Sequence, residues 1–257
     1  MKRYTVVLFD FDGTLYDSEG HFDQYVREIT THLSENRGRA LVNAYAATRQ
    51  QTGMLRIGEW YNPTRQQSVA HTAKTEETPQ GYYMGDYWWI IHALGLFQGA
   101  TEEQLASSFL RTREYMMHHT EEIQMVFGLK DWLTEAKRRE FTKIVLATNS
   151  PAQDSIAILG NLGVLDLFAD VVCNAQKPAG MPAVLERITR EFHVAPDQIL
   201  SIGDHYYNDI APAISFGADT LFINRHMVSH PREATYEVQT SEQLISLLKN
   251  EIWAALK

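Results

Sequence analysis

Short runs of apolar, mostly β-branched residues recur along the chain, and segments of helical periodicity separate the later ones. Each run is too short for a helix and lacks apolar–polar alternation, as is typical of buried parallel strands. The runs are TVVLF at 5–9, KIVLAT at 143–148, DVVC at 170–173, ILSIG at 199–203 and TLFIN at 220–224. Strands that alternate with helices predict an α/β fold with a doubly wound parallel sheet.

The stretch between the first two runs contains no convincing strand. Its periodicity instead predicts helices near 21–35, 38–50, 83–97 and 101–119. The last of these opens with TEEQ, in which Thr101 and Gln104 match a capping box. The segment IGEWYNPTRQQ, which contains Pro63, is expected to be a loop.

This stretch is long enough to form a domain of its own, because a parallel crossover needs only about a dozen residues. We therefore expect an inserted all-helical domain at 16–126 and an α/β core domain made of 1–15 and 127–257. In the core, Ser150 is expected to cap the helix that follows the second run, with Pro151 at its first position.

Composition and charge exclude several classes of function. Of the 257 residues, 44% are hydrophobic and 21% charged, as in a soluble globular protein. The net charge of −9 argues against a partner such as nucleic acid. Cys173 is the single cysteine, so no internal disulfide forms. The apolar runs are too short for a signal peptide or a membrane span. We expect a soluble cytoplasmic protein, and the sequence does not indicate its oligomeric state.

Two aspartates end the first strand in the segment VVLFDFDGT. In an extended chain Asp10 and Asp12 face the same side while Phe11 turns away, and Gly13 permits a tight turn. Open α/β sheets bind ligands beyond the carboxyl ends of their strands. The other strand ends supply Thr148, Asn149, Ser150, Lys177, Asp204 and Asp209.

Carboxylates crowded at one sheet edge repel one another unless a cation neutralises them. Oxygen ligands without a cysteine or a histidine pair favour Mg²⁺ over zinc. A magnesium ion beside a lysine and a hydroxyl group suits a phosphoryl group, and an aspartate can attack phosphorus directly. We therefore expect one aspartate of the pair to attack and the other to transfer protons.

These segments resemble the haloacid dehalogenase (HAD) superfamily, in its phosphatase branch with a helical cap, as in phosphoglycolate phosphatase-like members. The matching motifs are DFDGT at 10–14, ATNS at 147–150, KP at 177–178 and GDHYYND at 203–209, in the family's order. The resemblance implies a Rossmann-like core and a cap domain formed by the insertion. The aspartate at position 12 implies phosphoryl transfer instead of dehalogenation.

The resemblance also implies a role for each motif residue. Asp10 would be the nucleophile and Asp12 the general acid and base. Thr148 and the backbone of Asn149 would bind the phosphoryl oxygens, and Lys177 would orient both the nucleophile and the phosphate.

The implied cofactor is Mg²⁺, held by Asp10, the Asp12 carbonyl group and Asp204. Asp209 would be either a supporting ligand or the partner of Lys177.

The expected activity is magnesium-dependent hydrolysis of a phosphomonoester through an aspartyl-phosphate, with a small phosphorylated metabolite as substrate. A phosphomutase of the same superfamily and a non-catalytic phosphometabolite-binding protein remain the alternatives. The residues expected to contact the substrate are His205, Arg56, Trp60 and Arg65. The sequence does not identify the substrate.

Overall fold

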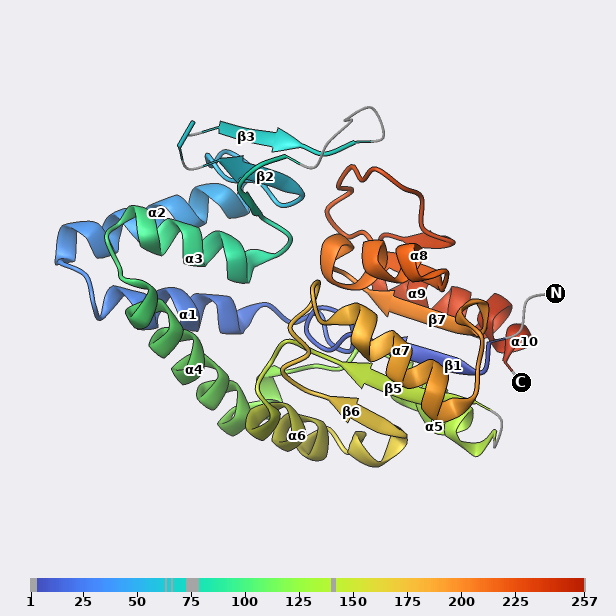
Figure 1. Cartoon of the computed structure of the whole chain (residues 1–257). Helices are drawn as coiled ribbons and strands as arrows, with labels where there is room; N and C mark the ends of the chain where they lie inside the picture. Colours follow the sequence, from blue (N-terminus) through green and yellow to red (C-terminus); the bar gives the residue numbers. More distant parts are fainter. Residues whose placement is uncertain (1–3, 63, 66, 73–78, 140–141, 257) are drawn as a thin grey trace. The chain divides into compact units, whose positions relative to one another are not determined.

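The computed structural model describes residues 4–62, 64–65, 67–72, 79–139 and 142–256 (Figure 1). The chain divides into two compact units. Unit 1 consists of Met1–Ser18, Thr120–Met227 and Glu233–Lys257, and unit 2 consists of Glu19–His119 and Val228–Arg232. The expected loop position Pro63 lies outside the described residues.

Unit 1 contains a six-stranded parallel sheet with the strand order β6-β5-β1-β7-β8-β9. Its strands are β1 (Val6–Phe9), β5 (Lys143–Ala147), β6 (Asp170–Val172), β7 (Ile199–Gly203), β8 (Asp219–Ile223) and β9 (Tyr236–Val238). The predicted α/β fold with a parallel sheet is therefore confirmed. The edge strand β9 was not predicted, because it has three residues of which only Val238 is buried.

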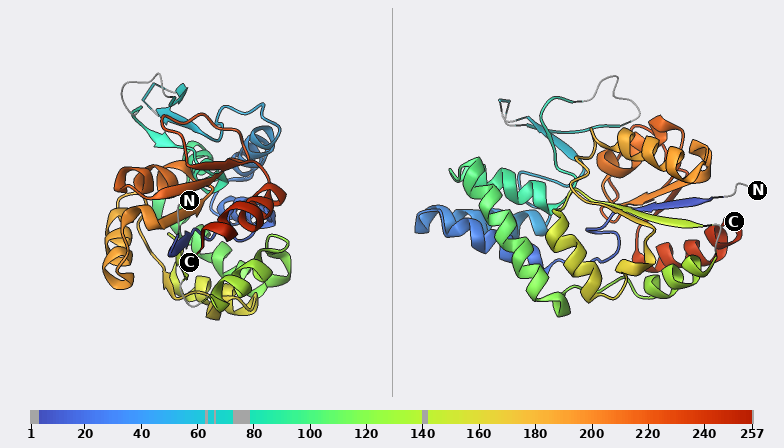
Figure 2. Two further views of the ribbon diagram at one scale, coloured as in Figure 1. Left: turned by 90° about the vertical axis from the view of Figure 1, so that its right-hand side faces the viewer. Right: turned by 60° about the horizontal axis from the view of Figure 1, so that its bottom comes forward.

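Helices cover both faces of this sheet (Figures 1 and 2). They are α5 (Leu129–Arg138), α6 (Ala152–Asn161), α7 (Met181–Phe192), α8 (Ala211–Phe216), α9 (Ser241–Leu247) and α10 (Trp253–Ala255). On one face, Leu8 of β1 belongs to an apolar cluster with Leu185 of α7. On the other, the ring of Phe9 lies 6.0 Å from Trp132 of α5. Because both faces are covered, all four residues of β1 are buried.

The start of α6 differs from the prediction by one residue. Pro151 occupies the N-cap position, and no side chain caps this helix. Ser150 lies one residue before the N-cap, and its hydroxyl group donates a hydrogen bond of 2.7 Å to Oδ2 of Asp12. This hydroxyl group therefore connects two loops, a contact that cannot be predicted from the local sequence.

Unit 2 contains the helices α1 (Gly20–Thr30), α2 (Glu35–Arg49), α3 (Tyr87–Phe97) and α4 (Glu102–His118). Phe22, Tyr25 and Ile29 of α1 recur at helical spacing and are buried in the unit's core. The predicted capping box at the start of α4 is confirmed, since Thr101 and Gln104 exchange hydrogen bonds of 3.2 and 2.9 Å. Among the described residues, no helix has the length and apolar character needed to cross a membrane.

The all-helical insertion expected from the sequence needs one correction, because it also contains a small antiparallel sheet. Its strands, in the order β3-β2-β4, are β2 (Glu59–Asn62), β3 (Gln67–Ala70) and β4 (Tyr82–Tyr83). They are short, their residues are exposed or half-buried, and only Tyr61 is buried. Strand β2 forms within the segment expected to be a loop, where its antiparallel pairing with β3 and β4 outweighs a weak local pattern.

Candidate functional site

Asp10 directly follows β1, an inner strand of the sheet. Its amide donates a hydrogen bond of 2.9 Å to the carbonyl group of Ile202 in β7, so the strand pairing continues to this residue. Its side chain is 11% exposed. The sheet therefore gives this carboxyl group a fixed direction and little contact with water.

Lys177 connects Asp10 to a second carboxylate. Its Nζ donates hydrogen bonds of 2.6 Å to Oδ1 of Asp10 and 2.6 Å to Oδ1 of Asp209. A third bond of 2.9 Å reaches the carbonyl group of Ala147. An ammonium group has three donors, and all three are used here. A phosphoryl oxygen would therefore receive a hydrogen bond from Lys177 only in exchange for one of these acceptors.

The side chain of Asn149 fixes the backbone of Lys177. Its Oδ1 accepts a hydrogen bond of 2.6 Å from the Lys177 amide, and its Nδ2 donates one of 3.0 Å to the Lys177 carbonyl group. The loops that follow β5 and β6 are thereby held together. The sequence indicated a role for the Asn149 backbone but not this one for its side chain, which depends on a contact between two loops.

Both carboxylate oxygens of Asp12 accept hydrogen bonds from hydroxyl groups. The phenol of Tyr16 donates to Oδ1, and the hydroxyl of Ser150 donates to Oδ2 at 2.7 Å. Neither donor was predicted from the sequence as a partner of Asp12. For the contact of Tyr16 with Asp12, the sequence offers one local indication, since the tyrosine follows the aspartate by four residues across a turn.

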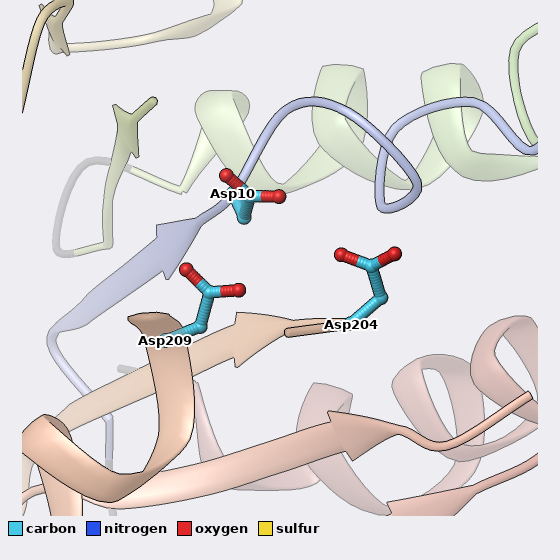
Figure 3. A group of neighbouring side chains, drawn as sticks. All are labelled: Asp10, Asp204 and Asp209. Carbon is cyan, nitrogen blue, oxygen red and sulfur yellow. The ribbon is translucent and has the colours of Figure 1, made fainter. Parts of the chain in front are cut away.

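Three carboxyl groups lie together beyond the ends of β1 and β7 (Figure 3). One oxygen each from Asp10, Asp204 and Asp209 lie within 4.8 Å of one another. Hard oxygen donors at this spacing fit a magnesium ion. Oδ2 of Asp209 also accepts a hydrogen bond of 3.2 Å from the His205 amide. Both oxygens of Asp209 are thus engaged, which favours its role as the partner of Lys177.

Two glycines leave the space that these carboxyl groups occupy. A Cβ atom at Gly13, whose φ is +74°, would lie 2.0 Å from Oδ2 of Asp204. A Cβ atom at Gly203 would lie 2.4 Å from Cβ of Asp209. Any side chain at either position would displace a carboxylate of the cluster.

The sequence as a whole is similar to that of a known protein family. It matches the profile of a hydrolase family, the haloacid dehalogenase-like hydrolases, over residues 4–217. The chain belongs to this family. A search of curated protein sequences gave no match.

Several solved structures share the fold of this HAD-like hydrolase. The candidate HAD-hydrolase YfnB from Bacillus subtilis, bound to magnesium, is 17% identical with a TM-score of 0.59, covering 96% of this chain and 99% of YfnB. A predicted phosphoglycolate phosphatase from Haemophilus somnus is 15% identical with a TM-score of 0.59, covering 96% and 99%. A HAD phosphatase from Thermococcus onnurineus is 20% identical with a TM-score of 0.51, covering 98% and 99%.

Burial and neighbouring charges act in opposite directions on the central ion pair of this HAD-like hydrolase. Burial raises the pKa of Asp10 to about 7, because the charged form is poorly solvated there, and the charge of Lys177 opposes this rise. Burial also disfavours the Lys177 ammonium group, but Asp10 and Asp209 outweigh that effect and raise its pKa above the ordinary value. Lys177 therefore stays charged at neutral pH.

Two further predicted site residues belong to the same unit. Thr148 is buried, and its Oγ1 accepts a hydrogen bond of 3.0 Å from the Ser150 amide. His205 is buried too, and its Nδ1 accepts a hydrogen bond of 3.1 Å from the Asn208 amide at the start of a π-helical turn, Tyr206–Ile210. Phosphate binding by Thr148 and substrate contact by His205 remain predictions.

The other expected substrate contacts belong to unit 2. Trp60 lies in β2, and its ring is 5.5 Å from that of Tyr83 in β4. Arg56 and Arg65 are exposed, and the Arg65 amide donates a hydrogen bond of 3.0 Å to Oδ1 of Asn62. The prediction that these three residues contact a substrate stays a prediction.

Proposed function

We propose that this HAD-like hydrolase is a magnesium-dependent phosphatase that hydrolyses a small phosphorylated metabolite through an aspartyl-phosphate on Asp10. The observation that carries the proposal is the Lys177 ammonium group between Asp10 and Asp209, with Asp204 beside them. It orients a buried carboxylate next to groups that suit a cation. Attack on a phosphoryl group requires both features.

In the first step, an oxygen of Asp10 forms a bond to phosphorus while the bond between phosphorus and the ester oxygen breaks. Asp12 gives its proton to that oxygen, which leaves as an alcohol. In the second step, Asp12 takes a proton from a water molecule as the water oxygen attacks phosphorus, and the bond to Asp10 breaks. The products are an alcohol and inorganic phosphate, and both aspartates return to their starting states.

The remaining site residues would hold the reacting groups. We assign the phosphoryl oxygens to the Thr148 hydroxyl group and the Asn149 backbone. The cation would be held by Asp204, together with Asp10 and the carbonyl group of Asp12, and Asp209 would be at most a weaker ligand. Bound Mg²⁺ would supply positive charge that offsets the repulsion between the carboxylates and the phosphoryl oxygens.

Similarity to other proteins supports this reading. Two of the neighbouring folds are described as phosphatases, and a third was solved with magnesium bound. Unit 2 would be the cap that selects the leaving group, through Arg56, Trp60 and Arg65, with His205 contributed by unit 1. A single cysteine agrees with a cytoplasmic location, where disulfides are rare.

Phosphate release from a panel of phosphomonoesters, with and without Mg²⁺, tests the proposal. We expect release that needs magnesium and falls to background in Asp10→Asn, which keeps the side-chain shape but removes the nucleophile. Asp197→Asn, at an exposed carboxylate of unit 1, is the matched control and should retain full activity.

Other results would contradict the proposal. Release that persists in Asp10→Asn, or that is independent of magnesium, would exclude the aspartyl-phosphate route. Isomerised product with little net phosphate would indicate a phosphomutase. A folded protein that binds magnesium and releases no phosphate from any ester would indicate a binding protein.

A further inference from the structure

The hydrogen bonds to Asp12 point beyond the general mechanism to two residues outside the proposed reacting set. Tyr16 and Ser150 donate one bond each, to different oxygens of the same carboxylate. An ionised carboxylate offers about four acceptor positions over its two oxygens. Because each hydroxyl donates to a different oxygen, the two bonds together fix the plane of the carboxyl group.

The Tyr16 hydroxyl is held in place by the packing of its ring and by its backbone. Its side chain is fully buried, and its ring meets that of Phe11 edge-on at a centroid distance of 5.5 Å. Its backbone forms β-bridges to both Asp12 and Met125. A tyrosine fixed at both ends of its side chain cannot swing away without disturbing the loop that carries Asp12.

The Ser150 hydroxyl is fixed in a comparable way from the opposite loop. Ser150 is buried, and its amide donates a hydrogen bond of 3.0 Å to Oγ1 of Thr148. Its carbonyl group accepts one of 3.0 Å from the Asn174 amide. The two donors thus come from segments 134 residues apart in sequence, positions 16 and 150, and both are held by their own backbones.

We infer that Tyr16 and Ser150 are positioning residues that hold the Asp12 carboxyl group in line with the leaving oxygen of the substrate. This inference rests on the proposed function. As the bond between phosphorus and the ester oxygen breaks, the proton of Asp12 moves to that oxygen and leaves a carboxylate. The two hydroxyl groups donate to the carboxylate that forms, so they assist the step in which its proton departs.

Esters with different leaving groups distinguish this role from a merely structural one. An alkoxide needs a proton as it leaves, whereas p-nitrophenolate leaves without one. The values of kcat/KM for glycerol phosphate and for p-nitrophenyl phosphate both report the steps up to release of the leaving group. A defect in proton donation therefore lowers the first value much more than the second, while a general loss of structure lowers both alike.

The variants are Tyr16→Phe and Ser150→Ala, each measured on both esters. We expect kcat/KM for glycerol phosphate to fall about 10- to 100-fold, within what proton transfer contributes, and for p-nitrophenyl phosphate less than about threefold. Tyr4→Phe is the matched control, because it also removes a buried phenol bond to an aspartate of unit 1, Tyr4 to Asp219 at 2.7 Å. It should leave the ratio of the two kcat/KM values unchanged.

The inference is overturned if both esters lose activity equally in Tyr16→Phe and Ser150→Ala, or if neither does. Should Tyr16→Phe not fold, Ser150→Ala carries the test alone, because it removes only one hydroxyl group. If the wild type releases phosphate from neither ester, nor from any ester of the panel, the proposed function fails, and this inference with it. Active wild type, inactive Asp10→Asn and an unchanged ratio would overturn the inference alone.

Discussion

At the scale of single residues, the site combines groups that could not be ionised together without compensation. Asp10, Asp204 and Asp209 supply three carboxylates, and Lys177 supplies one positive charge. A divalent cation would neutralise the remaining negative charge. The charge and the oxygen atoms of these residues therefore both suit magnesium. Burial raises the pKa of Asp10 to about 7, so proton and metal compete for the same carboxylate near neutral pH.

Magnesium affinity should therefore depend on pH. Below pH 7 the Asp10 carboxyl group holds its proton, and above pH 7 it is ionised, so binding should weaken as the pH falls. Between pH 8 and pH 6 we expect the affinity to drop about tenfold, by linkage to one proton. Isothermal titration with Mg²⁺ at both pH values measures this. Asp10→Asn should bind more weakly and without this dependence. Equal affinity at the two pH values in the wild type would show that Asp10 is ionised throughout.

At the scale of elements, short loops after parallel strands determine the geometry of the site. The turn after β1 approaches Asp204 so closely that only glycine fits at position 13. The turn contains one helical hydrogen bond, in which the Leu15 amide donates to the Phe11 carbonyl group at 2.9 Å. The loop therefore depends on one residue without a side chain, at a φ that other residues rarely adopt.

Gly13→Ala should weaken magnesium binding while the sheet stays folded. The added Cβ would meet the Asp204 carboxylate, and moving a ligand or its support costs about 10- to 100-fold in metal affinity. Titration calorimetry measures the loss, and circular dichroism checks the fold. Gly160→Ala in α6 is the control, because a Cβ there would have no atom within 4 Å apart from its chain neighbours and the backbone of its own helix. Gly160→Ala should bind magnesium normally. Normal binding by Gly13→Ala would show that a Cβ at position 13 does not displace the Asp204 carboxylate.

At the scale of the whole molecule, the chain builds two units with separate apolar cores. It passes between them at residues 18–19, 119–120, 227–228 and 232–233. The core of unit 2 is formed by its own helices and strands, including Ile29, Leu94 and Leu105. The carboxylate cluster belongs entirely to unit 1. A ligand of the cluster therefore stabilises unit 1 directly.

Added magnesium should slow hydrogen exchange in unit 1 more than in unit 2. At a concentration 100 times its Kd, the metal should increase protection of slowly exchanging amides in β1 and β7 by about 2.7 kcal/mol. Amides in α1 and α4 should change little, because their packing lies in unit 2. Mass spectrometry of peptides from the full-length protein measures both. An equal gain in the two sets would show instead that the units unfold as one.

Much of the fold of unit 1 could be predicted, because strands buried on both faces leave continuous apolar runs in the sequence. The runs at 5–9 and 199–203 became β1 and β7 almost to the residue. Strands β2, β3, β4 and β9 were not predicted, because short strands with few buried residues show little hydrophobic pattern in the sequence. They form only when a partner strand supplies the hydrogen bonds.

The sequence by itself determined the fold class and the group of polar residues at the strand ends, because both depend on local patterns of residue type. The tertiary structure alone decided the partners. It engages all three donors of Lys177, and it directs the side chain of Asn149 to the Lys177 backbone. It also places the Ser150 hydroxyl group, expected to cap a helix, in a hydrogen bond to Asp12. Such contacts join residues far apart in the chain, and only folding specifies the distances between them.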